Sequence, residues 1–410
     1  MKSGIVVCLC LVALVCGLCH AAEERTFDLV GAPAPLFRDP IWDGAADPAP
    51  VWNHQAKEWW VYYTQRRATL QPNEGVEFCH GSAIGIAASK DGRQWRYLGV
   101  CQGDQGLGDP IAGNCSWWAP GVLYHEGLYH MYVSWVDGIY TEWIGKRFIK
   151  HFTSADGKTW TYQSTLDLSS DRCIDAGIYR AGGTWCMLYK DEVHGSRSYL
   201  AQSDDLYRWK VVGPAVTDVS HEAPFVWQWH GAYWLVVDSW QRGIRVYRSQ
   251  DGLTDWQYTG SLLREPGKRD KDDAQGGHPG IILLGDRAII LYHVHYPPAH
   301  PLYGTNRTAL QAAELEYHDG TITCGVAPGG GAEFAITLPI AATLGAPAPA
   351  EPPAPGGVAP AGRILVVDDE EGIRHMLAEI LAADGHVVEE ADSGRQALEW
   401  LDRARFDLVI

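Results

Sequence analysis

The chain has 410 residues and a formal net charge of −17 at pH 7. This acidic excess argues against nucleic acid as a partner, because binding to phosphates needs clustered Lys and Arg. The 18 Trp and 19 Tyr, beside only 8 Phe and 4 Met, favour β structure and surfaces that stack on flat ligands.

Residues 1–22 have the pattern of a signal peptide that is removed on export. The apolar run from Ile5 to Leu18 is too short to span a bilayer comfortably, and cleavage is expected near Ala21 or Ala22. We therefore expect a secreted or periplasmic protein with no integral membrane segment after signal removal. A lipid-anchored form is disfavoured, because the later leader cysteines follow Val and Leu instead of a small residue.

Six cysteines lie beyond the leader, an even count that permits disulfides in an exported protein. The sequence does not choose among the many possible pairings, and none of the spacings resembles a zinc site. These cysteines are Cys79, Cys101, Cys115, Cys173, Cys186 and Cys324.

Four copies of a turn motif repeat within residues 23–340. In each copy a short strand-like run is followed by Ser, Asp and usually Gly, and the motif closes on a Trp. The four copies end at Trp95, Trp160, Trp209 and Trp256. Such residues suit a tight turn with the Trp packed beneath it, so we interpret the motif as structural.

A second repeated pattern lies upstream of these turns, in five copies: a short apolar strand, a polar turn and an aromatic-rich strand. The fifth copy lacks the Ser-Asp-Gly turn and continues into LQAAELEYHDGTIT, which suits a final hairpin. Four short strands per unit and five units over about 310 residues predict an all-β fold, a five-bladed β-propeller.

One residue from each copy falls at the same place when the five copies are aligned on their first strand. These residues are Asp47, Trp118, Asp175, Glu222 and His278. The first strand of each blade lines the axis of a propeller, so we expect the five side chains to converge on one pocket. A single such Asp usually caps a turn, but three converging acids raise one another's pKa and cost stability, which points to chemistry or a bound cation.

Cleavage of a glycosidic bond needs a carboxylate that activates water and a protonated acid that meets the leaving oxygen. Asp47 and Glu222 suit the base and the acid of an inverting enzyme, because blades one and four lie across the axis. Asp175, in the blade next to Glu222, is expected to raise the pKa of Glu222 and keep it protonated. Asp39 is a rival base, but only Asp47 begins a strand pair that matches the other copies.

The ordered set Asp-Pro, Trp-Ala-Pro, Ile-Asp, Glu-Ala-Pro and Gly-His-Pro-Gly resembles glycoside hydrolase family 43 and its five-bladed relatives over about residues 35–325. The resemblance implies an inverting glycosidase for polysaccharide-derived oligosaccharides, with Asp47, Asp175 and Glu222 as base, pKa modulator and acid. It also implies that His278 holds a structural metal ion, usually calcium, through water at the propeller axis. No cofactor is expected to be required for the reaction.

Further candidates for substrate binding are weaker, since each is more often packing than ligand contact. They are Trp117, Trp118, Trp227, His221 and Lys190. His221 directly precedes the proposed acid, which resembles a related five-bladed family acting on agar oligosaccharides in which a histidine has been considered for the acid. The sugar and the linkage therefore stay open.

Two other functions fit the same architecture. A non-catalytic carbohydrate-binding propeller would use the axial acids only for a cation and the aromatic residues for sugar. A phosphorolytic enzyme would need a cationic phosphate site, although the sequence shows no convergent cluster. The basic residues available for such a site are Arg66, Arg67, Lys190 and Arg242.

Residues 341–361 are rich in Pro and Ala and predict an extended linker. Residues 362–410 then alternate strands and helices and resemble the first half of a response-regulator receiver domain. Asp368 and Asp369 match that family's magnesium-binding acids, but the chain stops at Ile410, before the phospho-accepting Asp. We expect a truncated α/β fragment with an unpaired edge, and assign it no signalling function.

Overall fold

The computed structural model describes residues 25–264, 275–296, 300–318, 320–324, 362–367, 374–375, 378, 381–382 and 385–409. The predicted signal peptide, the predicted linker and the Asp368–Asp369 pair lie outside the described residues. The chain divides into two compact units, Met1–Ala335 and Ile336–Ile410. In the described part of the chain, no helix is long and apolar enough to cross a membrane.

Five antiparallel sheets, each made of strands consecutive in the sequence, form the first unit. Blade 1 contains β1 (Ala45–Asn53), β2 (Glu58–Gln65), β3 (Ala83–Ser89) and β4 (Arg96–Val100). Blade 2 contains β6 (Ser116–His125), β7 (Leu128–Val136), β8 (Arg147–Ser154) and β9 (Thr159–Thr165), with the short β5 (Gln102–Gly103) parallel to β9 at its edge.

The remaining three blades follow the same order. Blade 3 contains β10 (Cys173–Ala181), β11 (Thr184–Asp191), β12 (Arg197–Ser203) and β13 (Lys210–Val216). Blade 4 contains β14 (Glu222–Trp229), β15 (Ala232–Asp238), β16 (Ile244–Ser249) and β17 (Gln257–Leu262). Blade 5 contains β18 (Gly276–Leu284), β19 (Arg287–His295), β20 (Thr308–His318) and β21 (Thr321–Cys324).

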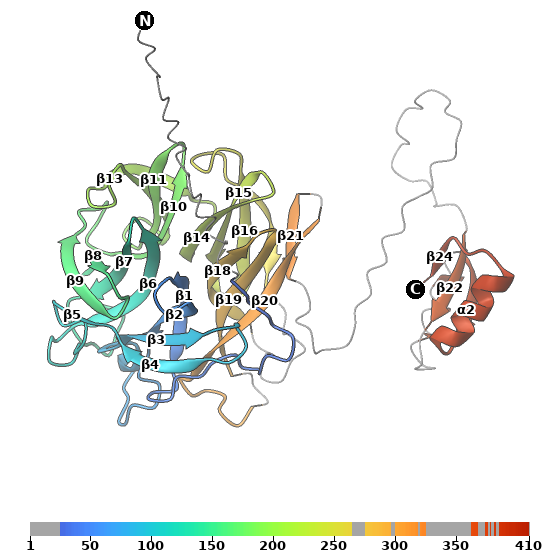
Figure 1. Ribbon diagram of the computed structural model, residues 1–410, viewed down its shortest axis with the longest axis horizontal. Helices are drawn as coiled ribbons and strands as arrows, with labels where there is room; N and C mark the ends of the chain where they lie inside the picture. Colours follow the sequence, from blue (N-terminus) through green and yellow to red (C-terminus); the bar gives the residue numbers. More distant parts are fainter. Residues whose placement is uncertain are drawn as a thin grey trace, which may run out of the picture. The chain divides into compact units, whose positions relative to one another are not determined.

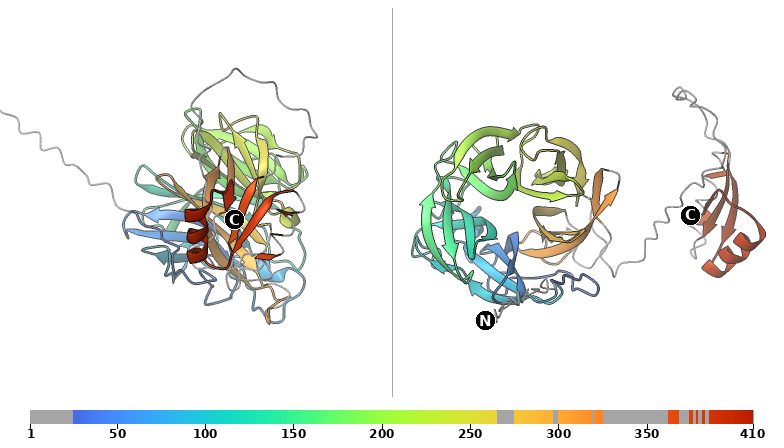
Figure 2. Two further views of the ribbon diagram at one scale, coloured as in Figure 1. Left: turned by 90° about the vertical axis from the view of Figure 1, so that its right-hand side faces the viewer. Right: turned by 45° about the horizontal axis from the view of Figure 1, so that its top comes forward.

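The five sheets stand radially around one axis, as Figure 1 and the right-hand view of Figure 2 show. This arrangement confirms the predicted five-bladed β-propeller. The final hairpin expected from LQAAELEYHDGTIT is the antiparallel pair of β20 and β21.

The repeated Ser-Asp turns join the third and fourth strands of blades 1 to 4. In blade 1, Ser89 Oγ accepts the N–H of Gly92 at 2.9 Å, and Asp91 Oδ1 accepts the N–H of Arg93 at 2.9 Å. The same serine bond recurs at Ser154, Ser203 and Ser249. The turn motif is therefore structural, as the sequence predicts.

Aromatic and aliphatic side chains fill the space between neighbouring blades. One core cluster joins Trp60 and Tyr62 of blade 1 to Trp117 and Met131 of blade 2. A corresponding cluster between blades 4 and 5 contains Trp227. The high content of Trp and Tyr is thus explained mainly by packing between blades, with burial of each ring removing a large apolar area from water.

The segment before β1 closes the ring. Phe27, Leu29, Leu36 and Phe37 are buried in the cluster that joins blade 1 to blade 5. Phe37 also forms an antiparallel bridge with Leu310 of β20. The first and last blades are therefore joined by the chain that precedes both of them.

All six described cysteines are free thiols, and five of them are buried. The disulfides that the composition permits are therefore not formed among the described residues.

The second unit has a three-stranded parallel sheet in the order β23-β22-β24. Its strands are β22 (Arg363–Val367), β23 (Val387–Ala391) and β24 (Leu408–Val409), and the described helix is α2 (Gly394–Arg403). Ser393 caps α2, since its hydroxyl accepts the N–H of Gln396. Parallel strands with a helix confirm the partial α/β fragment predicted from the sequence.

Candidate active site

A cavity of about 720 Å³ lies where the five inner strands begin, and residues from all five blades line it. This volume is within the usual range of small-molecule sites. The five residues of the axial alignment, Asp47, Trp118, Asp175, Glu222 and His278, all line the cavity.

A bulge near the start of each inner strand aims these side chains. The register between the first and second strands shifts at this point in every blade. The first bulged residues have positive φ, and they are Asp47, Ala119, Asp175, Ala223 and His278. Trp118 and Glu222 are the last paired residues before the bulge, so the predicted alignment is wrong by one residue in blades 2 and 4. Because a bulge re-aims its neighbours, residues at both positions reach the cavity.

Each bulge is anchored by the blade that precedes it in the ring. Asp47 N–H donates to His293 Nδ1 at 3.3 Å, and His278 N–H donates to Asp238 Oδ2 at 2.9 Å. Ala119 N–H donates to Thr64 Oγ1 at 2.8 Å, and Asp175 N–H to Ser134 Oγ at 3.0 Å. These bonds compensate for a backbone conformation that non-glycine residues rarely adopt.

The bulge of blade 4 is anchored differently. The equivalent second-strand residue in blade 3 is Lys190, paired with Ile174. An ammonium group has no acceptor, so Ala223 N–H donates to Asp175 Oδ2 instead, at 3.1 Å. Lys190 is thereby left to pair with Glu222, whose Oε2 lies 2.9 Å from Lys190 Nζ.

Asp47 is held as a carboxylate. Arg66 Nη2 lies 3.1 Å from Asp47 Oδ1, and His278 Nδ1 lies 3.4 Å from the same oxygen. Burial alone would raise the pKa of Asp47, but the charge of Arg66, with His278 second, holds that pKa well below its usual range. His293 is neutral, because burial and Arg66 lower its pKa, and its Nδ1 accepts a hydrogen bond from Asp47 N–H.

Glu222 is paired with a cation, whereas the sequence predicts that a neighbouring carboxylate dominates its charge environment. Burial would raise its pKa, but the Lys190 ammonium lowers the pKa below the usual value for Glu. The expectation that Asp175 keeps Glu222 protonated is therefore wrong, because the directly bonded cation outweighs repulsion from Asp175.

Two other carboxyl groups in the cavity retain protons more readily. Burial raises the pKa of Asp175 to about 6, and burial together with Glu222 raises the pKa of Asp238 to about 6. Asp238 is not one of the residues singled out from the sequence. Near pH 6 the carboxyl groups of Asp175 and Asp238 are therefore partly protonated.

Two exposed tryptophans stand at the rim of the cavity. Trp143 lies between β7 and β8 and is 54% exposed, and Trp240, in the short helix η2 (Trp240–Arg242), is 42% exposed. Trp240 N–H donates to Asp238 Oδ1 at 2.7 Å, and its ring lies 5.4 Å from Lys190 Nζ. Exposed rings beside polar groups suit stacking on the apolar face of a sugar.

Comparison with known families gives this cavity its context. The model of glycosyl hydrolases family 43 matches residues 37–322. The chain belongs to this family. It is therefore a glycosidase. The matched region includes strands of all five blades and the residues that line the cavity. The receiver domain model of response regulators matches residues 364–410 of the same chain.

Solved structures share the fold of this family 43 glycosidase at low sequence identity. A thermostable family-43 glycoside hydrolase has 17% identity and a TM-score of 0.51, over 70% of this chain and 95% of that one. RS223-Beta-xylosidase has 15% identity and a TM-score of 0.51, over 69% and 96%. A family 43 enzyme from Xanthomonas citri, solved with xylotriose, has 15% identity and a TM-score of 0.50, over 70% and 91%. Among curated proteins, nothing matches.

Four residues weighed as functional lie outside the cavity of the glycosidase. Trp117 and Trp227 are buried between blades, so they are packing residues and not sugar contacts. His221 is fully buried, and its Nε2 bonds the hydroxyl and the N–H of Ser198 at 2.8 and 3.1 Å. Asp39 is also buried, where it accepts the Tyr63 hydroxyl at 2.6 Å. Trp118 and Lys190 do line the cavity.

The basic residues of the glycosidase do not form a phosphate site. Arg66 is paired with Asp47, and Lys190 with Glu222 and Glu192. Arg67 turns away, with its Nε bonded to the carbonyl of His80, and Arg242 does not line the cavity. The phosphorolytic alternative therefore lacks the convergent cations that it needs.

A calcium site is not built from direct ligands. Among the residues that the structure describes, no group of three His, Cys, Asp or Glu side chains is arranged to hold a metal ion. His278 Nδ1 faces Asp47, whose negative charge is already matched by Arg66. The residues present thus do not fit a directly held ion, and water-mediated calcium at His278 stays a prediction.

The anchoring residues on the second strands, which are not among the candidates from the sequence, share a recognisable sequence pattern. The second strand of each blade carries a polar residue after an apolar run, in VYYT, MYVS, MLYK, LVVD and ILYH. Aligning these runs gives the four anchoring residues Thr64, Ser134, Asp238 and His293, with Lys190, already a candidate from the sequence, at the equivalent position of blade 3. The rim residues Trp143 and Trp240 lie in loops outside the repeat, so no alignment of blades would find them.

Proposed function

We propose that this glycosidase hydrolyses oligosaccharides derived from polysaccharides with inversion at the anomeric carbon. Asp47 is the general base and Glu222 the general acid. The observation that carries the proposal is the pair of carboxylates that reach one cavity from non-adjacent blades, with Asp47 held ionised by Arg66. An inverting enzyme needs such a pair with room for water between them.

In the proposed reaction, Asp47 accepts a proton from a water molecule whose oxygen attacks the anomeric carbon. The bond from this carbon to the leaving oxygen breaks, and Glu222 donates its proton to that oxygen. The pKa of about 6 of Asp175 and of Asp238 supports a shared proton near Glu222 in mildly acidic solution. We therefore expect kcat/KM to be greatest near or below pH 6.

The sugar is proposed to stack between the rim tryptophans Trp143 and Trp240, with Trp118 deeper in the cavity. The cavity carries the carboxylates of five acidic residues and two cations that are already paired, which favours neutral over anionic sugars. The structural neighbours include a β-xylosidase and an enzyme solved in complex with xylotriose, so xylo-oligosaccharides are the first compounds to test.

The test is a screen of the full chain against oligosaccharides of xylan, arabinan, galactan and agar, with product anomers followed by NMR. An initial product of inverted anomeric configuration is expected. Asp47→Asn and Glu222→Gln should each lower turnover of the natural substrate by about 10³-fold or more while leaving the protein folded, with a single cooperative thermal transition. Near-wild-type turnover in Glu222→Gln, or an initial product of retained configuration, would contradict the assignment.

A further inference from the structure

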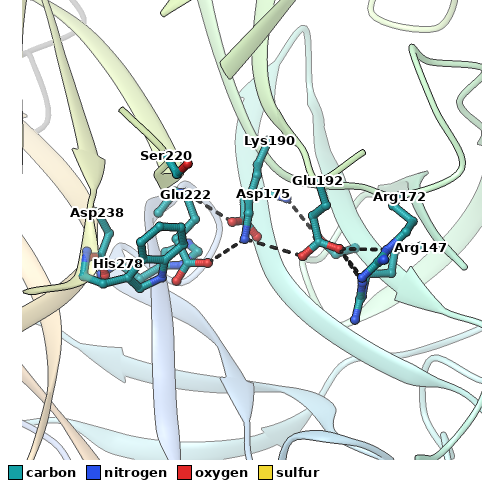
Figure 3. A network of polar contacts seen from close by, with 12 residues as sticks. Arg147, Arg172, Asp175, Lys190, Glu192, Ser220, Glu222, Asp238 and His278 are labelled. Carbon is teal, nitrogen blue, oxygen red and sulfur yellow. Dashed lines mark hydrogen bonds and ion pairs between the residues drawn. The ribbon is translucent and has the colours of Figure 1, made fainter. Parts of the chain in front are cut away.

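Glu192 lies next to the proposed acid without being part of the catalytic pair. It follows β11, and its Oε1 lies 3.5 Å from Lys190 Nζ, which also lies 2.9 Å from Glu222 Oε2. Figure 3 shows the ammonium between the two carboxylates. The Lys190 side chain is only 6% exposed, so protein carboxylates and not water balance most of its charge.

Two arginines fix Glu192 in place. Its Oε2 contacts the buried guanidinium of Arg147, and Arg172 Nε lies 3.2 Å from the same oxygen. Arg147 in turn lies over the ring of Trp118, 5.3 Å from its centroid. Since Oε2 is engaged on both sides, Glu192 presents only Oε1 to Lys190 (Figure 3).

Lys190 is less constrained by its contacts than Glu192, which two arginines hold. Its ammonium is a point charge with three donors on a flexible stem, unlike the planar fork of an arginine. A shift of the ammonium toward Glu192 would lengthen the contact with Glu222 without leaving the buried charge unpaired. The two contacts at 2.9 and 3.5 Å place the ammonium nearer to Glu222 than to Glu192.

The proposed reaction needs the Lys190 ammonium both close to Glu222 and shifted away from it, at different stages. A cation against Glu222 opposes protonation before the reaction, yet it stabilises the carboxylate that forms when the proton is given up. We propose that Glu192 is a positioning residue that shares the Lys190 ammonium with Glu222. It draws the ammonium away while Glu222 holds its proton, and returns it as Glu222 becomes a carboxylate. This inference rests on the proposed role of Glu222 as the acid.

Protons balance in this cycle. Glu222 gives one proton to the leaving oxygen and later regains one from solvent, while Lys190 keeps all three of its own. Arg147 and Arg172 repel a third cation, so they bias the ammonium toward Glu222. Other charged groups face Glu222 from neighbouring elements and are unchanged in the variants that test the proposal: Asp47, Arg66, Asp175, Asp238 and His278.

The test measures the pKa of Glu222 directly, by carboxyl ¹³C NMR titration of the full chain labelled at Glu. The signal of Glu222 is the one that Glu222→Gln removes. In Glu192→Gln the ammonium has lost its second partner and stays on Glu222, so the pKa of Glu222 should fall by about one unit. In Arg172→Gln the repulsion is weaker and the ammonium shifts toward Glu192, so this pKa should rise by about half a unit.

The basic limb of the pH profile of kcat/KM should move in the same two directions. A purely structural role for Glu192 would lower kcat or thermal stability in both variants without opposite shifts. Arg172 has a side chain that is 39% exposed, so Arg172→Gln keeps the proposal testable if Glu192→Gln does not fold.

A Lys190→Met background separates the shared ammonium from direct repulsion. If Glu192 acts through Lys190, adding Glu192→Gln to Lys190→Met should leave the pKa of Glu222 unchanged. A shift of the same size with and without Lys190 would overturn the proposal. Turnover retained in Glu222→Gln would instead remove the proposed acid, whereas loss of turnover there with no opposite pKa shifts would remove only the positioning role.

Discussion

The guanidinium of Arg66 lies 3.1 Å from the carboxylate of Asp47, and both side chains are largely buried. Burial and the same arginine lower the pKa of His293, whose neutral ring accepts a hydrogen bond from the Asp47 amide. One cation just after β2 therefore holds the proposed base ionised and helps keep the histidine that anchors it neutral.

Replacing this cation should move the acidic limb of the activity profile. In Arg66→Gln the carboxylate of Asp47 loses its main stabilising charge, so the pKa of Asp47 should rise and the acidic limb of kcat/KM should shift to higher pH by about one to two units. The pH profile of kcat/KM measures this shift. Arg93→Gln, a change at an exposed turn arginine, is the control and should leave both limbs in place.

The ionised carboxylate of Asp175 should destabilise the folded protein at neutral pH. Its pKa is raised to about 6 in the folded protein, above the usual value for Asp, so its stabilising contribution is full below about pH 4 and is lost as the pH rises through about 6. Asp175→Asn keeps an acceptor for Ala223 N–H without the charge. Its unfolding temperature should exceed that of the wild type by several degrees at pH 8 and equal it near pH 4.

The exposed turn residue Asp205 provides a control of opposite sign for this prediction. Its pKa is lowered by hydrogen bonds from the N–H groups of Arg208 and Tyr207. Asp205→Asn should therefore lower the unfolding temperature at pH 8, with the difference disappearing in strong acid. An Asp175→Asn protein that is less stable than the wild type at pH 8 would refute the cost assigned to the buried charge.

The rim tryptophans should contribute to binding and not to folding. Trp143→Ala and Trp240→Ala each remove an exposed ring that lines the cavity, so KM for an oligosaccharide should rise about tenfold with little change in kcat. Steady-state kinetics on substrates of one to four sugar units would show which ring serves which unit. An unchanged KM in both variants would remove these residues from the substrate site.

Trp227 should show the reverse pattern, because it lies in the core between blades 4 and 5. Trp227→Ala should lower the free energy of unfolding by about 3–5 kcal/mol and leave KM of the folded protein unchanged. Denaturant titration and kinetics on the same preparation measure the two quantities. A raised KM with wild-type stability would restore Trp227 as a sugar contact.

His221 should behave as a structural residue despite its position beside the proposed acid. His221→Ala removes two hydrogen bonds to Ser198 and should destabilise the protein by about 1–3 kcal/mol. The limbs of the pH profile should stay where they are in the wild type. Disappearance of the basic limb in this variant would identify His221 as the acid.

The sequence predicts the number of blades because both repeated patterns, the four Ser-Asp turns and the five strand pairs, depend only on local chemistry. A Ser and an Asp two residues apart specify the same hydrogen bonds in each of the four copies. The axial set is predicted to within one residue for a related reason, since the first strands align by their own pattern. The one-residue error at Trp118 and Glu222 arises because a bulge breaks the alternation that strand alignment assumes.

The charge state of the site depends on contacts that no single strand reveals. Lys190 reaches Glu222 from another blade, and its ammonium reverses the effect on Glu222 that the position of Asp175 suggests. From the sequence alone, Arg66 is only a basic residue near the first blade. Distances between blades decide which charge dominates, and the sequence does not contain them.

The anchoring of each bulge by the preceding blade has a consequence for engineering. The support of every pocket residue passes from one sheet to the next around the circle, so no arc of three or four sheets contains a complete site. Circular permutation through an outer Ser-Asp turn would keep every such bond, whereas deletion of one sheet would release the strand that depends on it. The smallest catalytic unit of this protein is therefore the closed ring.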